Sequence, residues 1–580
     1  MAKQLPKLVM LVLFLLAFFC NPVLATTEKG DTLVIHQADQ DLMPWNEIVS
    51  ADTNSDGTHA HAVYELDPNS WYPVSGQLVF NEDMTIIGGK RTSETDTRPW
   101  ILTTDPWTGW YMLGGSKNIT LKGLHMMQMA ETVGGNISAW ARSGMQLTGE
   151  NSKVVVEDCI WDFNTGFALN MTKNGLNLEV RNCLFRFSKP TDNSVWAGQG
   201  IDISSAQLDT VIIQNCTWYG GGPFMLKTWA STEKYFKMDH CSIIDFAQWP
   251  LHGVQWVNSV FTNNLFYNAY TMGEDRDQIL GQDPDGLPFG VMDVDTTFYD
   301  VDTVITGADT VINSTVNWTK ETARNLLVSN NNNFIKQNIM DYWAVAMSGD
   351  TIYHDFVAPD PADYHGFINK RTKAMFENDA TWPGLVLQNT TTLDPQFASY
   401  FDYSDTLINY SKAYYSYAWP NAKKTQFMLD PDGEPLQPTD PMVYNLKVNN
   451  ASLRSAATDG GVIGDLTWEL PNGYNSIQAD IATDVKRSNL DKPSEFALNQ
   501  NYPNPFNPST VITFSLAKES NVTLNVYNII GQKVATLVNK RMGSGNYEYK
   551  FDASNLGSGV YIYRLETDNF SVAKKMMLIK

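Results

Sequence analysis

One pattern of apolar and polar positions recurs along the chain between residues 119 and 340. Each copy has six positions: an apolar residue, any residue, then Asp, Asn or His, then Cys or Asn, any residue, and an aromatic residue or Ile. The copies begin at Val156, Val180, Ile213, Met238 and Phe261, and Val328 begins another after a long insertion. A period of about two dozen residues made of short strands predicts a solenoid in which each repeat is one turn. We therefore expect a parallel β-helix, in which equivalent residues stack along the axis.

Apolar runs upstream of this repeat extend the predicted solenoid toward the N-terminus. Alternating segments at residues 63–66, 76–80, 84–88 and 119–124 are expected to form its first turns. Alternate positions of the strands would line a continuous interior, filled by apolar and aromatic side chains. The predicted fold class is all-β, with the β-helix domain over residues 26–470.

The N-terminus has the three parts of a secretion signal. Lys3 and Lys7 precede an apolar run over residues 8–19, and residues 23–25 end in the small residue of a cleavage site. The run is shorter than the roughly 20 residues that span a bilayer, so we predict a signal peptide over residues 1–25 and no membrane span in the mature chain. Cys20 follows two Phe residues instead of small ones, so lipidation is not expected.

The chain changes character at residue 494, after a predicted linker over residues 471–493. Pro503, Pro505 and Pro508 exclude a helix or a central strand at this boundary. Short alternating runs then follow, separated by Gly, Asn and Ser, and they predict an immunoglobulin-like β-sandwich over residues 494–580. These runs lie at residues 511–516, 522–527, 533–537, 547–551, 560–565 and 571–578.

This C-terminal segment resembles the type A sorting domain of type IX secretion cargo. The resemblance rests on Tyr-Pro-Asn-Pro-Phe-Asn-Pro at residues 502–508, Gly-Gln-Lys-Val at 531–534, Leu-Gly-Ser-Gly-Val-Tyr at 556–561 and Lys-Lys-Met at 574–576. It implies that the type IX machinery recognises the module and usually removes it outside the outer membrane. We therefore expect a secreted or cell-surface protein. The alternative is a sandwich that stays with the protein and binds carbohydrate or adheres.

The solenoid pattern resembles the pectate-lyase-like superfamily of right-handed β-helices and, more loosely, secreted β-helix proteins related to chondroitinase. Residues 394–397 and 459–468 are similar to segments that close such proteins. The resemblance implies a polysaccharide lyase or a glycoside hydrolase. A lyase neutralises a uronate carboxylate, often with calcium, and abstracts a proton with Lys, Arg or a similar base.

Two segments of the repeat are the candidates for that chemistry. Asp239-His240 is similar to the Asp-His segment of pectate lyases, and Lys227, one turn earlier, is a candidate base. No Arg-x-Pro-x-x-Arg segment occurs, so the usual pectate lyase base is missing. The alternative is that His240 simply fills the Asn/Asp turn position of its repeat.

Candidate ligands for calcium and for sugar rings lie elsewhere. Asp52, Asn54 and Asp56 have the spacing that begins a calcium loop, but Val63 stands where the full motif has Glu, so a structural calcium or a polar turn is expected. Aromatic faces stack on sugars, and tryptophans outside the repeat core are candidates for a glycan groove, although solenoid loops also use Trp to cap a face. These candidates are Trp140, Trp196, Trp229 and Trp249.

The cysteines of the repeat share one position. An even number of Cys in a secreted chain suggests disulfides, and stacked neighbours would lie near bridging distance. A row of inward free thiols, packed as small apolar side chains, is the alternative that we favour. The absence of a Cys-x-x-Cys pair argues against zinc. The four residues are Cys159, Cys183, Cys216 and Cys241.

The net charge of the chain restricts the kinds of partner that it can be expected to bind. The formal charge is −22, with the acidic excess before residue 494, which argues against nucleic acid or an anionic membrane as a partner. We expect a secreted carbohydrate-active β-helix protein, a lyase or hydrolase acting on an extracellular acidic polysaccharide. The rival is a non-catalytic adhesin or a structural protein of the surface or matrix. The sequence leaves open whether the protein is an enzyme.

Overall fold

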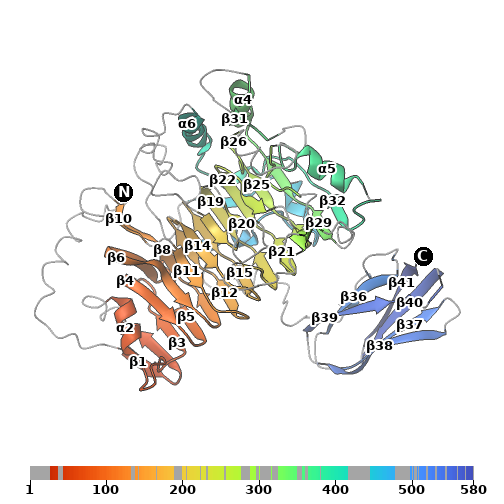
Figure 1. Cartoon of the computed structure of the whole chain (residues 1–580), viewed down its shortest axis with the longest axis horizontal. Coiled ribbons are helices and arrows are strands. Elements are labelled where there is room, and N and C mark those ends of the chain that lie inside the picture. Colours follow the sequence, from red (N-terminus) through yellow and green to blue (C-terminus); the bar gives the residue numbers. More distant parts are fainter. Residues whose placement is uncertain are drawn as a thin grey trace, which may run out of the picture. The chain divides into compact units, whose positions relative to one another are not determined.

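The computed structural model divides the chain into two compact units, residues 1–481 and residues 482–580 (Figure 1). The signal peptide predicted for residues 1–25 lies outside the described residues, and so does most of the linker predicted for residues 471–493. The structure describes residues 26–36, 44–131, 137–140, 143–164, 166–187, 199–203, 206–222, 224–229, 233–253, 256–275, 288–294, 299–300, 315–316, 324–348, 356–359, 364–378, 380–415, 444–476, 497–498, 501, 506, 508–516, 520–528, 532–542, 545–554, 556–557, 559–567 and 570–578.

Three ladders of short strands build the larger unit, and the first ladder is a 12-stranded sheet of its own. Its strands pair in chain order, and every pair except β1 with β2 is parallel. The strands are β1 (Thr26–Lys29), β2 (Thr32–Ile35), β3 (Val63–Leu66), β5 (Met84–Gly88), β7 (Ile119–Lys122), β12 (Lys153–Glu157), β15 (Asn177–Arg181), β18 (Thr210–Gln214), β21 (Tyr235–Asp239), β24 (Asn258–Thr262), β29 (Asn325–Ser329) and β32 (Leu385–Gln388).

The second and third ladders share a 14-stranded sheet. The second ladder consists of β8 (His125–Met127), β13 (Ile160–Asp162), β16 (Leu184–Arg186), β19 (Thr217–Gly221), β22 (Ser242–Phe246), β25 (Leu265–Tyr267) and β30 (Asn332–Phe334). The third consists of β11 (Ser143–Leu147), β14 (Phe167–Met171), β17 (Gln199–Asp202), β20 (Leu226–Trp229) and β23 (Leu251–Gly253). Strand β6 (Trp100–Gly115) pairs with both β8 and β11, and β4 (Trp71–Phe80) pairs with β6, so these two long strands begin both ladders.

Each repeat forms one turn of the solenoid, as the sequence predicts. One turn runs through β12, β13 and β14, and the next through β15, β16 and β17. Equivalent residues pair in register, so Val156 lies beside Val180 and Trp161 beside Phe185. Figure 1 shows the strands of successive turns stacked along the unit. The prediction of a parallel β-helix is confirmed.

The corner between the first and second ladders depends on the third residue of the repeat motif. Its φ lies between 50° and 60° in Asp158, Asn182, Asn215, His240, Asn263 and Asn330. This left-handed conformation is unfavourable for most residues, but Asn and Asp tolerate it because their short side chains hydrogen-bond locally. The Asp, Asn or His of the motif is therefore explained by the backbone of the corner. His240 occupies this corner with a φ of 51°, as its turn interpretation expects.

The fourth residue of the motif points into the solenoid. Cys159, Cys183, Cys216 and Cys241 are all buried and free, so the row of thiols is confirmed and the disulfide alternative is wrong. Burial raises the pKa of the Cys159 and Cys216 thiols. These two thiols therefore stay protonated, and all four side chains pack in the core as small hydrophobes.

Asparagines continue the thiol row into the later turns. The Asn264 side-chain oxygen accepts a hydrogen bond from the Cys241 backbone N–H at 2.9 Å. The Asn331 oxygen accepts from the backbone and the side-chain amide of Asn264, at 2.9 and 3.0 Å. The Asn264 and Asn331 amides also donate to main-chain carbonyls of the preceding turns, at 3.1 and 2.9 Å. These bonds satisfy amides that would otherwise be costly to bury.

The interior of the solenoid is one hydrophobic core. Its aromatic rings stack from turn to turn: the Trp161 and Phe185 centroids are 6.2 Å apart, and those of Phe185 and Trp218 are 4.7 Å apart. Helix α2 (Trp45–Ala51) packs Trp45 and Ile48 into the same core. This helix covers the apolar side chains of the first turns.

The remaining elements of this unit lie outside the ladders. Residues 397–415 and 444–476, which we call the closing segment, pack Tyr403, Tyr444, Trp468 and Tyr474 on outward residues of the second ladder such as Ile160. Of the stretches predicted to close the solenoid, residues 459–468 lie within the closing segment, and residues 394–397 lead into its first residue. The closing segment contains β33 (Phe397–Ser399), α6 (Ser404–Tyr415), β34 (Asn445–Val448), η3 (Leu453–Ser455), η4 (Leu466–Glu469) and η5 (Gly473–Asn475). The others are β9 (Met129–Glu131), β10 (Ile137–Trp140), β26 (Glu274–Asp275), β27 (Tyr299–Asp300), β28 (Thr315–Val316), α4 (Gln337–Ala346), β31 (Phe356–Val357) and α5 (Lys370–Phe376).

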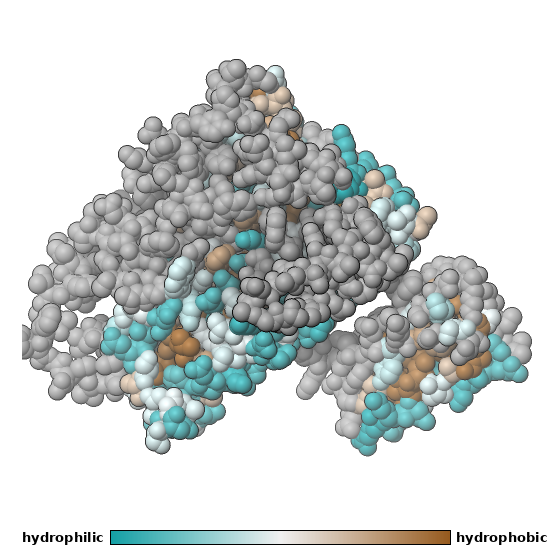
Figure 2. All heavy atoms as spheres, viewed as in Figure 1, coloured by the Kyte–Doolittle hydropathy of each residue, from teal (hydrophilic) through white to brown (hydrophobic). Residues whose placement is uncertain are grey.

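The C-terminal unit has two antiparallel sheets around its own core. One sheet contains β35 (Ala497–Leu498), β36 (Ser509–Leu516) and β39 (Gly545–Asp552), and the other β38 (Lys533–Met542), β37 (Ser520–Asn528), β40 (Gly559–Glu566) and β41 (Ser571–Leu578). Phe514 of the first sheet and Leu524 of the second belong to one buried cluster, which confirms the predicted sandwich. Figure 2 shows hydrophobic residues on the surface of this unit, where Ile562 and Met577 are exposed.

The left-handed conformation at the corner predicts that two variants of Asn182 differ in stability. Asn182→Ala and Asn182→Gly both remove the hydrogen bond that the Asn215 amide donates to Asn182 at 3.4 Å. Only Gly adopts a φ of 52° without steric penalty. We expect Ala to be less stable than Gly by about 1 kcal/mol in urea unfolding. Equal midpoints for the two variants would contradict the assignment of this corner.

The buried thiol row predicts protection from thiol reagents. In a chain that begins after the signal peptide, Cys159, Cys183, Cys216 and Cys241 should react with a maleimide only after denaturation. Mass spectrometry without reducing agent measures the labelling. A mass showing a disulfide after denaturation, or fast labelling of the native protein, would contradict the structure.

Candidate functional site

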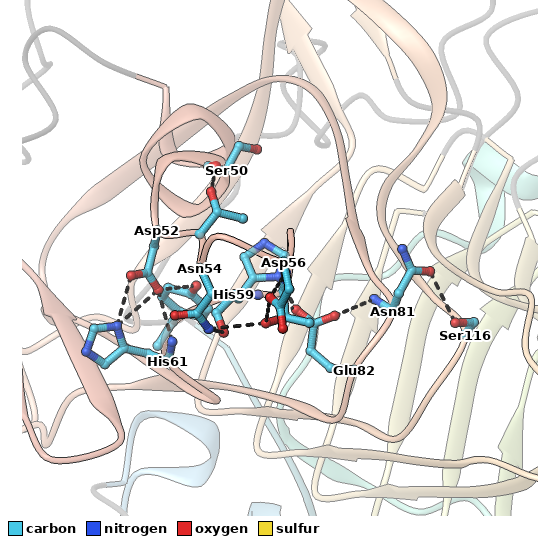
Figure 3. A network of polar contacts seen from close by, with 12 residues as sticks. Ser50, Asp52, Asn54, Asp56, His59, His61, Asn81, Glu82 and Ser116 are labelled. Carbon is cyan, nitrogen blue, oxygen red and sulfur yellow. Dashed lines mark hydrogen bonds and ion pairs between the residues drawn. The ribbon is translucent and has the colours of Figure 1, made fainter.

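The calcium candidates lie in a short hairpin between α2 and β3 (Figure 3). Thr53 and His59 form an isolated antiparallel bridge, and the Asn54 N–H donates to the Thr58 carbonyl at 2.7 Å. The Gly57 N–H donates to the Asn54 carbonyl at 3.0 Å, and Gly57 turns the chain with a φ of 86°. The hairpin is therefore closed by its own main chain.

The three candidate side chains contact different partners. Asp52 accepts hydrogen bonds from His61 Nδ1 at 3.0 Å and from the Tyr64 hydroxyl at 2.7 Å. The Asn54 amide donates to the Thr58 hydroxyl at 3.1 Å. Asp56 accepts from the same hydroxyl at 2.7 Å, which lowers the pKa of Asp56.

These contacts describe a polar turn. In the part of the chain that the structure describes, no group of three or more His, Cys, Asp or Glu residues is placed to hold a metal ion. Calcium binding by Asp52, Asn54 and Asp56 stays a prediction.

One histidine, His59, joins this hairpin to the solenoid. His59 contacts the Glu82 carboxylate through both its ring and its backbone N–H, and Figure 3 shows the chain of contacts continuing through Asn81 to Ser116. Burial opposes ionisation of Glu82, but the hydrogen bonds from His59 outweigh it and lower the Glu82 pKa. The network holds the hairpin against the loops that flank β5 and β6. Sequence reasoning missed it, although two histidines within a calcium-like loop were a usable signal.

The structure brings Asp239 and His240 together but places Lys227 on another ladder. Lys227 lies in β20 of the third ladder, beside Asp202 and His252 in register. Asp239 and His240 lie at the end of β21 in the first ladder.

Asp239 and His240 are both engaged in contacts that hold the solenoid together. Asp239 accepts hydrogen bonds from Thr262 at 2.8 Å and Asn263 at 2.9 Å, both in the next turn. His240 is 4% exposed and donates from Nδ1 to the Gly464 carbonyl of the closing segment at 3.2 Å. The closing segment therefore covers this corner. The catalytic role assigned to these residues stays a prediction.

The tryptophans predicted to line a glycan groove have different surroundings. Trp140 ends β10 and Trp229 ends β20, but their side chains lie outside the described residues, as does all of Trp196. Trp249 is 2% exposed, and its ring centroid lies 5.4 Å from that of Phe224 and 5.8 Å from that of Phe289. Trp249 therefore belongs to the core, and sugar binding by these tryptophans stays a prediction.

A buried charge cluster occupies the outer face of the second ladder. Arg186 donates to both oxygens of Asp162, from Nε at 2.8 Å and from Nη2 at 2.6 Å. His125 Nε2 lies 2.7 Å from Asp162 Oδ2, and Arg186 Nη1 contacts the Tyr444 hydroxyl at 3.4 Å. His125, Asp162 and Arg186 are at most 1% exposed. Burial acts to raise the pKa of Asp162, but the charges of Arg186 and His125 bring it down to about 2.

A second buried carboxylate, Asp245, lies near the end of β22, where its backbone has a left-handed φ of 54°. It accepts hydrogen bonds from the Asn268 amide at 2.9 Å and from the Tyr400 hydroxyl at 2.9 and 2.7 Å, one to each oxygen. Its exposed fraction is 0%, and burial raises its pKa to about 7. An ionisable group with such a shift marks a candidate functional site.

Tyrosines and an ion pair surround Asp245. The ring centroid of Tyr267 lies 5.2 Å from that of Tyr400, and that of Tyr219 lies 6.4 Å from it. Lys336 pairs with Asp402, and its backbone N–H donates to the Asn268 side chain at 3.0 Å. Tyr400 and Asp402 belong to the closing segment, so this segment completes the site.

Sequence reasoning missed both carboxylate clusters. Asp162 and Arg186 hold the same repeat position in consecutive turns, where the next turn has Tyr219. Opposite charges at one position of adjacent turns were a readable signal of an ion pair along the axis. Tyr400 and Tyr444 carried no such signal, because they reach the ladder from the closing segment, far along the chain.

Comparison with known proteins identifies the C-terminal unit. Residues 500–580 match the family model described as a secretion system C-terminal sorting domain, which confirms the predicted type IX sorting module and its role as a partner of that machinery. This match supports a secreted or cell-surface location. A search of curated proteins finds no match to the chain, so the resemblance to the pectate-lyase-like superfamily stays a prediction. None of the helices in the described residues is long and apolar enough to cross a membrane.

The buried ion pair predicts a large loss of stability on removal of one partner. Arg186→Leu leaves Asp162 buried beside His125 alone and should lower the free energy of unfolding by about 3–5 kcal/mol. Asp162→Leu combined with Arg186→Leu should recover part of this loss, because no unpaired charge remains. Because the folded pKa of Asp162 is about 2, its contribution should be present above about pH 4 and lost as the pH falls toward 2.

The matched control is the surface pair of Lys153 with Glu179, whose nitrogen and oxygen are 2.7 Å apart and whose Lys153 side chain is 50% exposed. Lys153→Met should change the free energy of unfolding by at most about 1 kcal/mol. Urea unfolding measures all variants. Similar losses for Arg186→Leu and Lys153→Met would contradict the role given to the buried pair.

Proposed function

We propose that this exported protein is carbohydrate-active and that its β-helix unit acts on an extracellular acidic polysaccharide as a lyase or hydrolase. The pair formed by Asp245 and Tyr400 carries the proposal. The match of the C-terminal unit to a sorting domain supports export, which brings the β-helix unit into contact with extracellular polymers.

The chemistry of the pair suits proton transfer at neutral pH. A carboxyl group with a pKa of about 7 is present in both protonation states there, which is the condition for general acid–base catalysis. The Tyr400 hydroxyl is within hydrogen-bond distance of both Asp245 oxygens, and Tyr400 itself is only partly buried. In a lyase reaction Tyr400 would take the C5 proton of a uronate and pass its own proton to Asp245. The C4–O bond would then break, its former oxygen taking a proton from water, as the C4–C5 double bond forms.

Charge near the pair fits a uronate. The Lys336 side chain is 28% exposed and lies beside Asp402, which is 47% exposed. A uronate carboxylate would compete with Asp402 for the ammonium group. Calcium, as a second neutralising charge, belongs to the same proposal.

We expect Asp245→Asn and Tyr400→Phe each to lower kcat at least about 100-fold, because each removes one member of the proton relay. In the wild-type protein kcat/KM should rise with pH through about 7, as Asp245 ionises, and this inflection should vanish in Asp245→Asn. The assay measures unsaturated uronate by ultraviolet absorbance, and reducing ends, on uronate and neutral polysaccharides with and without calcium.

Lys227→Ala and His240→Ala are the comparison variants. If they abolish activity and Asp245→Asn does not, the assignment from the sequence is right and the pair proposed here is wrong.

The stability of Asp245→Asn is measured separately, so that a loss of activity is not confused with unfolding. The raised pKa of Asp245 means that its ionisation destabilises the fold as pH rises from about 4 to about 7, so Asp245→Asn should unfold no more readily than wild type at pH 8.

A non-catalytic surface or matrix protein is the second candidate. The observation in its favour is that the closing segment covers outward residues of the second ladder, including Ile160, Leu184 and Tyr219. A solenoid with a covered face can act as a rigid spacer. The absence of any product on the whole polysaccharide panel, from folded protein, would favour this candidate.

A further inference from the structure

Three aromatic rings stack in register where the second ladder begins. Trp71 of β4 pairs with Trp100 of β6, and Trp100 pairs with His125 of β8. The Trp71 and Trp100 ring centroids are 5.2 Å apart with an interplanar angle of 8°, and those of Trp100 and His125 are 3.6 Å apart at 27°. Figure 1 shows β4 and β6 at the same end of the solenoid as α2.

The exposed fraction of the side chains increases along this stack from His125 to Trp71. His125 is 0% exposed and Trp100 is 6% exposed, whereas Trp71 is 49% exposed. In the described part of the chain β4 pairs only with β6, so Trp71 lies on an edge strand. One face of its indole rests on Trp100, and about half of the side chain remains open to solvent.

The stack is held rigidly from beneath. His125 is fixed by the contact of its Nε2 with Asp162 at 2.7 Å, and Asp162 is held by two nitrogens of Arg186, Nε and Nη2. Trp100 lies on this fixed ring, and Trp71 lies on Trp100. An aromatic side chain that is already ordered loses little conformational freedom when a ligand binds it.

The size of the exposed surface selects the kind of ligand. A stable protein partner buries about 800 Å² on each side, far more than one half-exposed indole offers. In the described residues of the solenoid unit, the other large apolar side chains exposed on β4 and β6 are Val79 and Trp110. A flat ring of this size matches the C–H face of one pyranose, and the apolar surface of the indole provides the contact.

We propose that Trp71 is a sugar-stacking subsite of the β-helix unit, separate from the Asp245 and Tyr400 pair. The ligand class is a glycan bound through the face of one pyranose ring. This inference rests on the proposed function, because it assumes that the polymer reached after export is a polysaccharide. It assigns Trp71 to substrate binding and not to proton transfer.

The test measures binding in the absence of cleavage. Isothermal titration of the full mature chain carrying Asp245→Asn uses two probes, a hexasaccharide of β-1,4-linked glucose and a hexasaccharide of galacturonate. Trp71→Ala should raise the Kd of the bound probe at least about 10-fold, because it removes the ring that the pyranose contacts. Trp71→Phe should keep most of the affinity, because a smaller ring can still stack on Trp100.

Trp110→Ala is the matched control, since Trp110 is 63% exposed but is not part of the stack. It should leave the Kd unchanged. Two outcomes would overturn the inference. One is a Kd that is the same with Trp71 and with Trp71→Ala, and the other is that the protein with an intact Trp71 binds neither probe. The two proposals fail differently: binding that depends on Trp71 without any cleavage by wild type refutes only the enzyme, and cleavage with an unchanged Kd in Trp71→Ala refutes only the subsite.

Discussion

In-register hydrogen bonding between parallel strands is the constraint on which the rest of the solenoid depends. It places each residue directly beside its equivalent in the next turn, so any preference of one position is repeated along the axis. The thiol row, the Asn264 and Asn331 bonds that continue it, and the left-handed corners all follow from this alignment. The stacks of aromatic rings inside and outside the solenoid have the same origin.

The two buried carboxylates of the second ladder show how their partners decide their chemistry. Asp162 and Asp245 are both 0% exposed, and burial acts to raise both pKa values. Asp162 has the guanidinium of Arg186 at 2.6 and 2.8 Å, which brings its pKa to about 2 and makes it a permanent structural charge. Asp245 is held by neutral donors, Asn268 and Tyr400, so its pKa stays near 7. Only the second group is poised to exchange a proton at neutral pH.

His125 links the charge cluster to the exposed aromatic surface. Its Nε2 contacts Asp162 and its ring face lies against Trp100, so this one side chain connects the ion pair with the stack. The two belong to different rows, because His125 pairs with Ile160 and Asp162 pairs with Met127. Trp71 lies on β4 at the edge of the second ladder, and Asp245 lies on β22, in a later turn of the same ladder. A polysaccharide is a linear ligand, and binding and proton transfer at different turns of one ladder suit such a ligand. The sorting unit has a hydrophobic core of its own.

The sequence by itself determined the solenoid, the inward thiols and the sorting sandwich, because each depends on short-range patterns that repeat or match a known module. Asp158, Asn182 and His240 were readable as one turn position because a single backbone conformation selects them all. The candidate site was decided only by tertiary structure. Tyr400 reaches Asp245 across 155 positions of the chain, and Tyr444 reaches Arg186 across 258. No periodic pattern relates residues of the closing segment to the ladder, so their contacts and the resulting pKa values arise only when that segment packs on the solenoid.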